Sequence, residues 1–176
     1  MKLMARLSIH EKANLLGDSV FAASDGIVTT FAIVAGSAGA SLSTGIVLIL
    51  GFANLFADGF SMAAGNYLGV KSEIEYEQAM GKNTKHEGSP IKHGLMTFFS
   101  FNIAGLLPLI PFLFQTKHAF IVSTILVGLT LLTVGLLRSM YTKKSYIVSG
   151  LEMLIVGGLA AGAAFGIGFL VRRYVI

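Results

Sequence analysis

Five apolar runs of about 20 residues, separated by short polar links, make up most of the chain. A run of this length is enough for an α-helix to cross the hydrocarbon core of a bilayer. The runs predict spans near residues 15–39, 44–69, 93–114, 119–138 and 147–171. Pro108 and Pro111 fall late in the third run, and we expect them to bend or end that helix. The pattern therefore predicts an all-α membrane protein, with five transmembrane helices forming a single domain over residues 1–176.

The composition agrees with this prediction. Of the 176 residues, 54% are hydrophobic and 12% are charged, with a mean hydropathy of +0.76; a soluble domain carries about 25% charged residues. Cysteine is absent, which excludes disulfides, thiolate metal sites and cysteine nucleophiles. Residues 1–18 are too polar for the apolar part of a signal peptide, and they predict a basic amphipathic approach to the first helix.

The distribution of Lys and Arg predicts the orientation. Five spans place the two termini on opposite sides of the membrane. With a cytoplasmic N-terminus, ten of the 13 basic residues lie inside: Lys2, Arg6, Lys12, Lys71, Lys82, Lys85, Lys92, Arg138, Lys143 and Lys144. Only Lys117, Arg172 and Arg173 lie outside. Because cytoplasmic links carry an excess of Lys and Arg, the N-terminus is expected to be cytoplasmic.

Each of the first two apolar runs contains an aspartate, Asp25 in the first and Asp58 in the second. A carboxylate at membrane depth is costly unless it meets a partner, an ion, a proton or water. Two of them on adjacent helices indicate a path for cations in which the carboxylates also carry protons. The alternative for Asp25 is a structural hydrogen bond to a neighbouring helix. Asp18 shares the helix face of Asp25, two turns away, and is either a pathway residue or a solvated carboxylate near the interface.

Four residues of the second run recur every four positions and so form one stripe: Asn54, Asp58, Met62 and Asn66. A methionine in a membrane is usually plain packing. Between a carboxylate and an amide, its thioether becomes a candidate soft ligand. Oxygen together with a thioether suits a borderline metal such as Fe²⁺ or Mn²⁺ better than Ca²⁺ or Mg²⁺. The stripe and Asp25 are therefore the candidate metal ligands, and Asp25 and Asp58 are the candidate proton carriers.

The link over residues 71–92 is predicted to be a short cytoplasmic loop. Glu73 and Glu77 are four residues apart and could share one face of an extension of the second helix, with Met80 nearby. These three side chains are a candidate site for metal capture. The alternative is a solvated charged loop. No histidine is expected inside a span; His93 stands at the first position of the predicted third span.

Two polar residues of the later spans have structural alternatives. Glu152 opens the last span as a pathway or interface residue, or as the partner of a basic residue such as Arg138. Asn102 is expected to join helices by a hydrogen bond. His118, in the last outer link, is expected to be solvated.

Glycines in the first and last runs predict close helix packing. Gly26, Gly36 and Gly39 would let a neighbouring helix approach the first span. The glycine-rich stretch 157–162 predicts close packing of the last span, including contact across a dimer.

The segments SDGIVTTFAIVAG (24–36) and ANLFADGFSMAAGNYLGVKSE (53–73) resemble the vacuolar iron transporter (VIT) family of proton-coupled Fe²⁺/Mn²⁺ transporters. The resemblance is strong over roughly the first 75 residues and weaker beyond. It implies a five-helix fold, a homodimer with the ion path at or near the subunit interface, and export of metal from the cytoplasm. It places Asp25 and Met62 on the path, and Asn54 where plant-type members carry a glutamate. Those members also insert a three-helix cytoplasmic metal-binding domain, for which residues 71–92 are too few.

The sequence thus favours a secondary transporter that moves Fe²⁺, with Mn²⁺ as an alternative substrate, out of the cytoplasm in exchange for protons. No nucleotide-binding motif is present, so an ion gradient is the evident energy source. No cofactor is expected, because the metal is the substrate. The expected partners are divalent metal ions, protons, the bilayer and a second copy of the chain, with no nucleic acid.

Two other functional classes are considered. An intramembrane enzyme finds no support, because neither HExxH nor GxSxG occurs, and the chain is not expected to be an enzyme. A non-transporting assembly or metal-sensing protein would use its buried polar residues only to hold helices together. The spacing of Asp58 and Met62 argues against that class, since a thioether adds nothing to a hydrogen-bonded seam. The expected membrane is a prokaryotic plasma membrane, with a vacuolar or other internal membrane as the alternative.

Overall fold

The computed structural model describes residues 9–81, 88–142 and 145–175, and within these ranges the chain contains helices and no strands. The elements are α1 (Ile9–Gly39), α2 (Thr44–Ala79), α3 (Pro90–Leu106), the 3₁₀-helix η2 (Leu107–Leu109), α4 (Ile110–Leu113), α5 (Ala119–Thr142) and α6 (Tyr146–Tyr174). Five segments are long and apolar enough to cross a membrane: Glu11–Gly39, Thr44–Ala79, Pro90–Leu113, Ala119–Ser139 and Tyr146–Tyr174. The all-α fold with five candidate spans, predicted from hydropathy, is confirmed.

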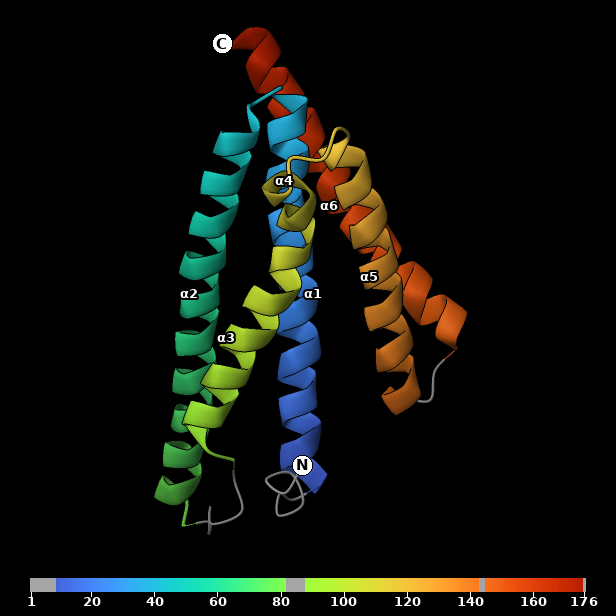
Figure 1. The fold of residues 1–176 in the computed structure, drawn as a ribbon. Helices are drawn as coiled ribbons and strands as arrows, with labels where there is room; N and C mark the ends of the chain where they lie inside the picture. Colours follow the sequence, from blue (N-terminus) through green and yellow to red (C-terminus); the bar gives the residue numbers. More distant parts are fainter. Residues whose placement is uncertain (1–8, 82–87, 143–144, 176) are drawn as a thin grey trace.

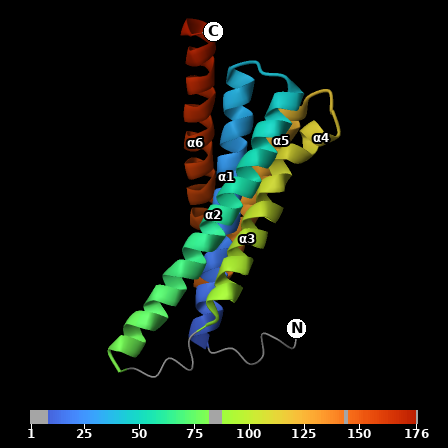
Figure 2. The same cartoon turned by 90° about the vertical axis from the view of Figure 1, so that its left-hand side faces the viewer.

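Helix α1 is the centre of the bundle. It contacts all four other long helices, with α2 and α3 on one side and α5 and α6 on the other (Figure 1). The second view shows α2 and α3 running beside α1, with the start of α1 and the end of α6 at opposite ends of the bundle (Figure 2). The core is built mainly from α1, α3 and α5, with one face of α2: Ala22, Ile27, Phe31, Val34, Leu55, Phe101, Val127 and Leu131. The apolar core is therefore arranged around α1.

Glycine permits the close crossing of α1 and α3. A Cβ atom on Gly26 would lie 2.4 Å from the carbonyl oxygen of Phe101, and one on Gly105 would lie 2.8 Å from the carbonyl oxygen of Gly26. Real Cβ contacts are longer than this, so only glycine lets the two backbones approach so closely. The predicted close approach of a helix to Gly26 is confirmed, and it occurs one residue from Asp25.

The last helix packs closely on α1 at one end. Gly168 of α6 lies against the backbone of Gly36, and Gly39 lies against the backbone of Phe165. In the stretch 157–162 the glycines differ: Gly157 packs on Leu131, whereas positions 158 and 162 have open space beside them. Close packing of α6 is confirmed at the first of these positions within a single chain. Contact across a dimer stays a prediction.

Helix α2 is longer than predicted. It has 36 residues and so measures about 54 Å, whereas the hydrocarbon core of a bilayer is about 30 Å thick. The predicted loop 71–92 was wrong in its first part, because the segment KSEIEYEQA is composed largely of good helix formers and contains no glycine or proline. The helix ends where Gly81 adopts a positive φ of 77°, a common way to terminate an α-helix.

The two prolines of the third span end α3, as predicted. The α-helix ends at Leu106 and continues as η2 and α4, which contain Pro108 and Pro111. The buried hydroxyl of Ser123 on α5 donates to the carbonyl oxygen of Pro108 at 2.7 Å, and so ties this irregular segment to the next span.

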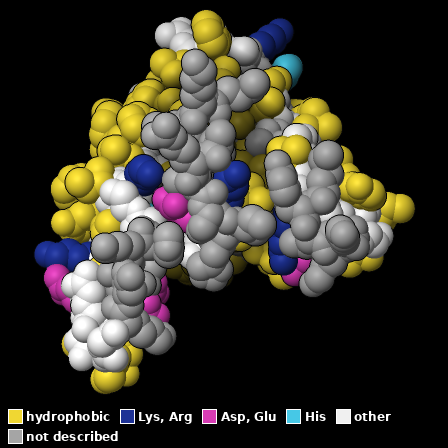
Figure 3. Space-filling model, turned by 90° about the horizontal axis from the view of Figure 1, so that it is seen from below, with side chains coloured by type: hydrophobic (Ala, Val, Ile, Leu, Met, Phe, Trp, Pro, Cys, Tyr) yellow, Lys and Arg dark blue, Asp and Glu magenta, His cyan; other side chains and the backbone are white. Residues whose placement is uncertain are grey.

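Charged side chains gather at the end of the bundle where α1 begins. Figure 3 looks onto this end and shows Lys, Arg, Asp and Glu side chains beside the hydrophobic flanks of the helices. The described charged residues near this end include Glu11, Lys71, Lys92, Arg138 and Glu152. Lys117, Arg172 and Arg173 lie toward the other end, in the link before α5 and in the last turn of α6.

Candidate ion-binding site

Acidic residues follow one face of α1 at intervals of seven. Glu11, Asp18 and Asp25 are each two helical turns apart, so they share a face. Helix α2 returns antiparallel to α1 after a short link, which sets its polar stripe beside this face at matching depths. The carboxylates of Asp25 and Asp58 are close enough for their charges to interact. The structure therefore brings together the two membrane-depth aspartates that the sequence predicted.

A cavity of about 370 Å³ lies between α1, α2 and α3, closer to the end where α1 begins. It is lined by Asp18, Phe21, Met62, Gly65, Asn66 and Thr97, and we refer to it as the vestibule. The Asn66 amide nitrogen donates to the Thr97 hydroxyl at 2.7 Å, across α2 and α3. Three candidate residues, Asp18, Met62 and Asn66, thus meet on the wall of one cavity.

Asp18 is paired with a histidine that the sequence analysis did not select. His93 Nδ1 lies 2.5 Å from Asp18 Oδ2, where an imidazole N–H donates to the carboxylate. His93 is only 4% exposed and lies in the first turn of α3, inside the third span. The expectation that no histidine lies inside a span was therefore wrong. Asp18 is thus hydrogen bonded as well as partly exposed, with 24% of its side chain accessible.

A local signal could have revealed His93. Pro90 stands in the first turn of α3, where its missing N–H costs nothing, so it marks the start of the helix. His93 and Thr97 are four residues apart and share one helix face. One residue earlier, Lys92 pairs with Glu11 at 3.6 Å, which adds a second ion pair between α1 and α3. The start of α3 thus carries three polar residues in reach of α1 and α2.

Asp25 and Asp58 are half-buried. Among the described residues, no hydrogen bond joins either carboxylate to another helix; the Thr29 hydroxyl donates only to the backbone carbonyl of Asp25. The structural hydrogen bond considered for Asp25 is thus not seen in this part of the chain. Asn54, also half-buried, has a side-chain nitrogen with no partner, and a buried amide nitrogen normally has one.

The described ranges hold no group of three or more His, Asp or Glu side chains arranged to bind a metal ion. Asp25 and Asp58 form a pair, and the remaining candidate donors along the stripe are amides and a thioether. A cation bound here would therefore complete its coordination with Asn or Met side chains, with water, or with a second copy of the chain.

The other candidate residues lie away from the vestibule. Glu73 and Met80 are exposed on the extension of α2, as is the Lys71–Glu75 pair beside them, and Glu77 is half-buried there. Glu152 pairs with Arg138 at 3.3 Å, which confirms the predicted salt bridge.

The predictions for Asn102 and His118 had different outcomes. The predicted interhelical hydrogen bond of Asn102 was wrong. Its amide donates to the carbonyl of Phe98 in its own helix, while the side chain packs against Gly59 of α2. His118 is exposed, as expected.

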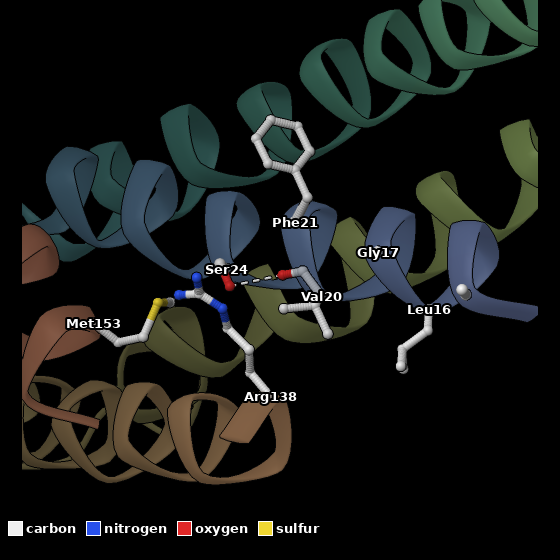
Figure 4. Close-up of a pocket in the computed structure, with 8 residues that line it drawn as sticks. Leu16, Gly17, Val20, Phe21, Ser24, Arg138 and Met153 are labelled. Carbon is white, nitrogen blue, oxygen red and sulfur yellow. Dashed lines mark hydrogen bonds between the residues drawn. The ribbon is translucent and has the colours of Figure 1, made fainter. Parts of the chain in front are cut away.

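A larger cavity, of about 540 Å³, lies between α1, α5 and α6. In Figure 4 the Arg138 guanidinium reaches across it toward Ser24, whose hydroxyl donates to the Val20 carbonyl. The rest of its wall is mainly apolar, with the Met153 thioether next to the guanidinium. None of the described residues that line this cavity is a carboxylate, and the guanidinium would repel a cation. Among the described lining residues of these two cavities, only those of the vestibule combine a carboxylate, an amide and a thioether.

The comparison with known proteins shows the family of the chain. The profile of the VIT family matches residues 16–88 and 78–169, which together span most of the chain. The chain belongs to the VIT family.

Its relatives include proteins from plants and fungi. Vacuolar iron transporter 1 of Eucalyptus grandis is 27% identical over 91% of this chain and 90% of its own length. Vacuolar iron transporter homolog 4 of Arabidopsis thaliana is 30% identical, over 93% of this chain and 87% of its own length. Vacuolar iron transporter cccA of Arthroderma benhamiae is 27% identical over 87% of this chain and 78% of its own length. These names give no support to the expected prokaryotic plasma membrane; the chain is an integral, multi-pass membrane protein of the VIT family.

This VIT-family chain is shorter in one place than some relatives. The alignment with the Eucalyptus protein has 223 positions, more than the 176 residues of this chain, so that relative has residues that this chain lacks. The alignment with the Arabidopsis protein has only 173. The two matched segments of the family profile meet between residues 78 and 88. The match is thus interrupted at the link between α2 and α3, the region that the sequence analysis found too short for a three-helix cytoplasmic domain.

In this VIT-family structure Glu152 lies away from the vestibule and from the Asp25–Asp58 pair. We therefore expect Glu152→Gln to leave metal transport unchanged. The side chain of Glu152 is 58% exposed, and that of its partner Arg138 is 36% exposed. An exposed ion pair of this kind contributes ~0–1 kcal/mol to the stability of a protein. Transport rate and thermal stability of the purified variant would be compared with wild type. A tenfold loss of transport by a folded variant would show that Glu152 takes part in the transport pathway.

Proposed function

We propose that this VIT-family chain is a secondary transporter that carries Fe²⁺, with Mn²⁺ as an alternative substrate, out of the cytoplasm in exchange for protons. One observation carries the proposal. The carboxylates of Asp25 and Asp58, one in each of the first two spans, are near enough for their charges to interact, and neither has a hydrogen bond to another helix in the described part of the chain. The names of the relatives, which specify iron, support the choice of substrate.

The pair of carboxylates accounts for the exchange. Two negative charges close together at membrane depth repel each other, and each is costly without a counter-charge. One divalent cation or two protons would neutralise the pair equally well. Because both cannot be bound at once, loading the metal on one side displaces protons and releasing it on the other side allows protons to return. This coupling needs no cofactor, and the sequence contains no nucleotide-binding motif.

The rest of the stripe supplies selectivity and hydration. Met62 is one turn from Asp58, where its thioether would favour a transition metal over Mg²⁺. Asn66 and Asn54 lie further along the same face, and their amides would complete the coordination or hold water. The unpartnered amide nitrogen of Asn54 supports the second role, because it can donate to a water molecule that travels with the ion.

The orientation and the assembly are part of the proposal. The excess of Lys and Arg favours a cytoplasmic location for the end of the bundle where α1 begins, and the vestibule lies toward this end. Metal would therefore enter from the cytoplasm through the vestibule and leave at the opposite end. A second copy of the chain would add the donors that the single acidic pair lacks.

The extension of α2 is proposed as a place of metal capture. Glu73, Glu77 and Met80 occur at positions i, i+4 and i+7 and so face the same way from a helix that continues beyond the bilayer. In this orientation the extension would present them to cytoplasmic metal.

The test is metal uptake by proteoliposomes that contain the purified protein and an internal pH dye. Entry of Fe²⁺ or Mn²⁺ accompanied by opposite proton movement supports the proposal. If folded wild-type protein moved neither metal nor protons, the buried polar stripe would serve only to hold the helices together, as in an assembly protein.

Replacing Met62 with leucine tests selectivity, because leucine fills a similar volume without a sulfur ligand. We expect the preference for Fe²⁺ over Mg²⁺ to fall about tenfold, which corresponds to a loss of ~1.4 kcal/mol in differential affinity. Competition by Mg²⁺ in the uptake assay measures this ratio. Met153→Leu is the matched control, since Met153 lines the other cavity. If the Fe²⁺-to-Mg²⁺ preference were the same in Met62→Leu and Met153→Leu, the Met62 thioether would have no role in selectivity.

A further inference from the structure

We infer that α3 builds a separate divalent-cation site in the vestibule, in which His93 and Thr97 hold Asp18 and Asn66 so that both face the passing ion. The ligands would be the free oxygen of Asp18 and the amide oxygen of Asn66, with the thioether of Met62, which lies between this site and Asp58 and would serve the ion at both. The inference rests on the proposed function for the identity of the ion and its direction of travel. The site itself is carried by the geometry of three helices.

The two α3 residues act as a clamp. His93 and Thr97 are four positions apart on one helix face, yet they hold residues of different helices, Asp18 on α1 and Asn66 on α2. Both are almost completely buried, at 4% and 2% exposed. A buried polar side chain held by a hydrogen bond in a packed helix has little freedom to rotate. Helix α3 therefore fixes the positions of both cavity-lining side chains.

The hydrogen bonds decide which atoms remain for a ligand. His93 occupies Oδ2 of Asp18, so Oδ1 is left to accept from, or to coordinate, another group. The Asn66 nitrogen donates to Thr97, so the amide presents its oxygen as the remaining polar atom. A carboxylate oxygen and an amide oxygen both accept hydrogen bonds, and neither can donate one. This combination suits a cation and would not bind an anion.

The chemistry of the ligand follows from the donor set. One negative charge with one neutral oxygen and one thioether gives a weak site for a divalent cation of borderline softness, such as Fe²⁺ or Mn²⁺. The cavity, at about 370 Å³, is several times the ~30 Å³ that a water molecule occupies in the liquid, so the ion can keep part of its hydration shell. Weak binding is what a site along a transport pathway requires, because the ion must also leave the site.

The position on α1 makes the site the step before the acidic pair. Asp18 is seven residues from Asp25, which is about 10.5 Å along the helix axis. Glu11, a further seven residues out, is already paired with Lys92 and so does not compete for the ion with a free charge. A cation held at Asp18 would therefore be attracted onward by the Asp25–Asp58 pair.

Binding of Mn²⁺ to the purified protein, followed by the loss of the free-ion electron paramagnetic resonance signal, tests the inference. The Asp25→Asn/Asp58→Asn double variant is used as the background, so that the acidic pair does not contribute. We expect weak Mn²⁺ binding to remain in this background. It should weaken at least fivefold when Asp18→Asn or His93→Leu is added.

Two further variants separate positioning from folding. In His93→Asn the amide nitrogen can replace Nδ1 as the donor to Asp18, so Mn²⁺ affinity should return to within about twofold of the background. His118→Gln, at an exposed histidine near the opposite end, should change nothing. The inference would be overturned if Mn²⁺ affinity were the same in the background and in folded protein with His93→Leu or His93→Asn added.

Transport separates this inference from the proposed function. In proteoliposomes, His93→Leu on the wild-type background should raise KM for Fe²⁺ several-fold with little change in the maximal rate, and His93→Asn should restore KM. Wild-type transport with an unchanged KM in His93→Leu would refute the vestibule site and leave the transporter intact. Absence of wild-type transport together with His93-dependent Mn²⁺ binding would refute the proposed function and retain the site.

Discussion

Replacing Asp58 with asparagine is expected to abolish coupled metal and proton movement, with a loss of about 100-fold or more in rate. Asparagine removes one of the two charges that a divalent cation needs at membrane depth, and its amide cannot take up the proton. An uncompensated charge in the middle of a bilayer costs ~3 kcal/mol on insertion scales, and each ~1.4 kcal/mol corresponds to a factor of ten. Asp25 lies close enough to feel the change directly.

The measurement is Fe²⁺-dependent proton movement in proteoliposomes, with the iron kept reduced. Glu75→Gln is the matched control, because it removes the same charge from an exposed pair with Lys71 on the same helix. It should transport like wild type. Residual exchange above about a tenth of the wild-type rate in Asp58→Asn, from protein shown to be folded, would exclude Asp58 as an obligatory carrier of the ion or the proton.

Hydropathy predicted the spans well because the pattern is set by the bilayer. Each apolar run had to reach about 20 residues, and the observed spans begin and end near the predicted positions except where a helix leaves the membrane. The extension of α2 shows the limit of this reasoning. Hydropathy falls after Gly69, so the predicted span ends there, yet helix propensity remains high through Ala79 and the helix continues to that residue. Apolar character and helical structure are separate properties at this boundary.

The candidate site was predictable to the extent that neighbouring helices determine it. Asp25 and Asp58 lie on consecutive antiparallel helices joined by a short link, so their positions along the chain already place them at similar depth. The pairing of Asp18 with His93 joins residues 75 positions apart and depends on how α3 is rotated against α1. A single sequence contains no direct information on that rotation. The prediction for Asn102 was wrong for a different reason, because its own helix offered a backbone acceptor, the Phe98 carbonyl.

Helix α3 also determines the geometry around Asp25, and this leads to the prediction with the largest effect on stability. In Gly26→Ala the new Cβ atom would lie 2.4 Å from the Phe101 carbonyl oxygen, which is backbone and cannot rotate away. Overpacking of this kind costs about 1–3 kcal/mol. We therefore expect the free energy of unfolding in detergent to fall by about 2 kcal/mol, and transport to fall with it because α1 must move away from α3 next to Asp25.

The control for Gly26→Ala lies on the same helix. A Cβ atom on Gly17 would meet no neighbouring atom within 4 Å, so alanine there removes only the flexibility of glycine. Since alanine is favoured over glycine in a helix by up to about 1 kcal/mol, Gly17→Ala should be as stable as wild type or more stable. Both are measured by denaturant or thermal unfolding of the purified protein. Equal stability of the two variants would show that α1 and α3 can separate at Gly26 without cost. Packing at Gly26 would then not fix the distance between α1 and α3. The positions of Asp25 and of the Asp18–His93 pair, which depend on that distance, would not be fixed by it either.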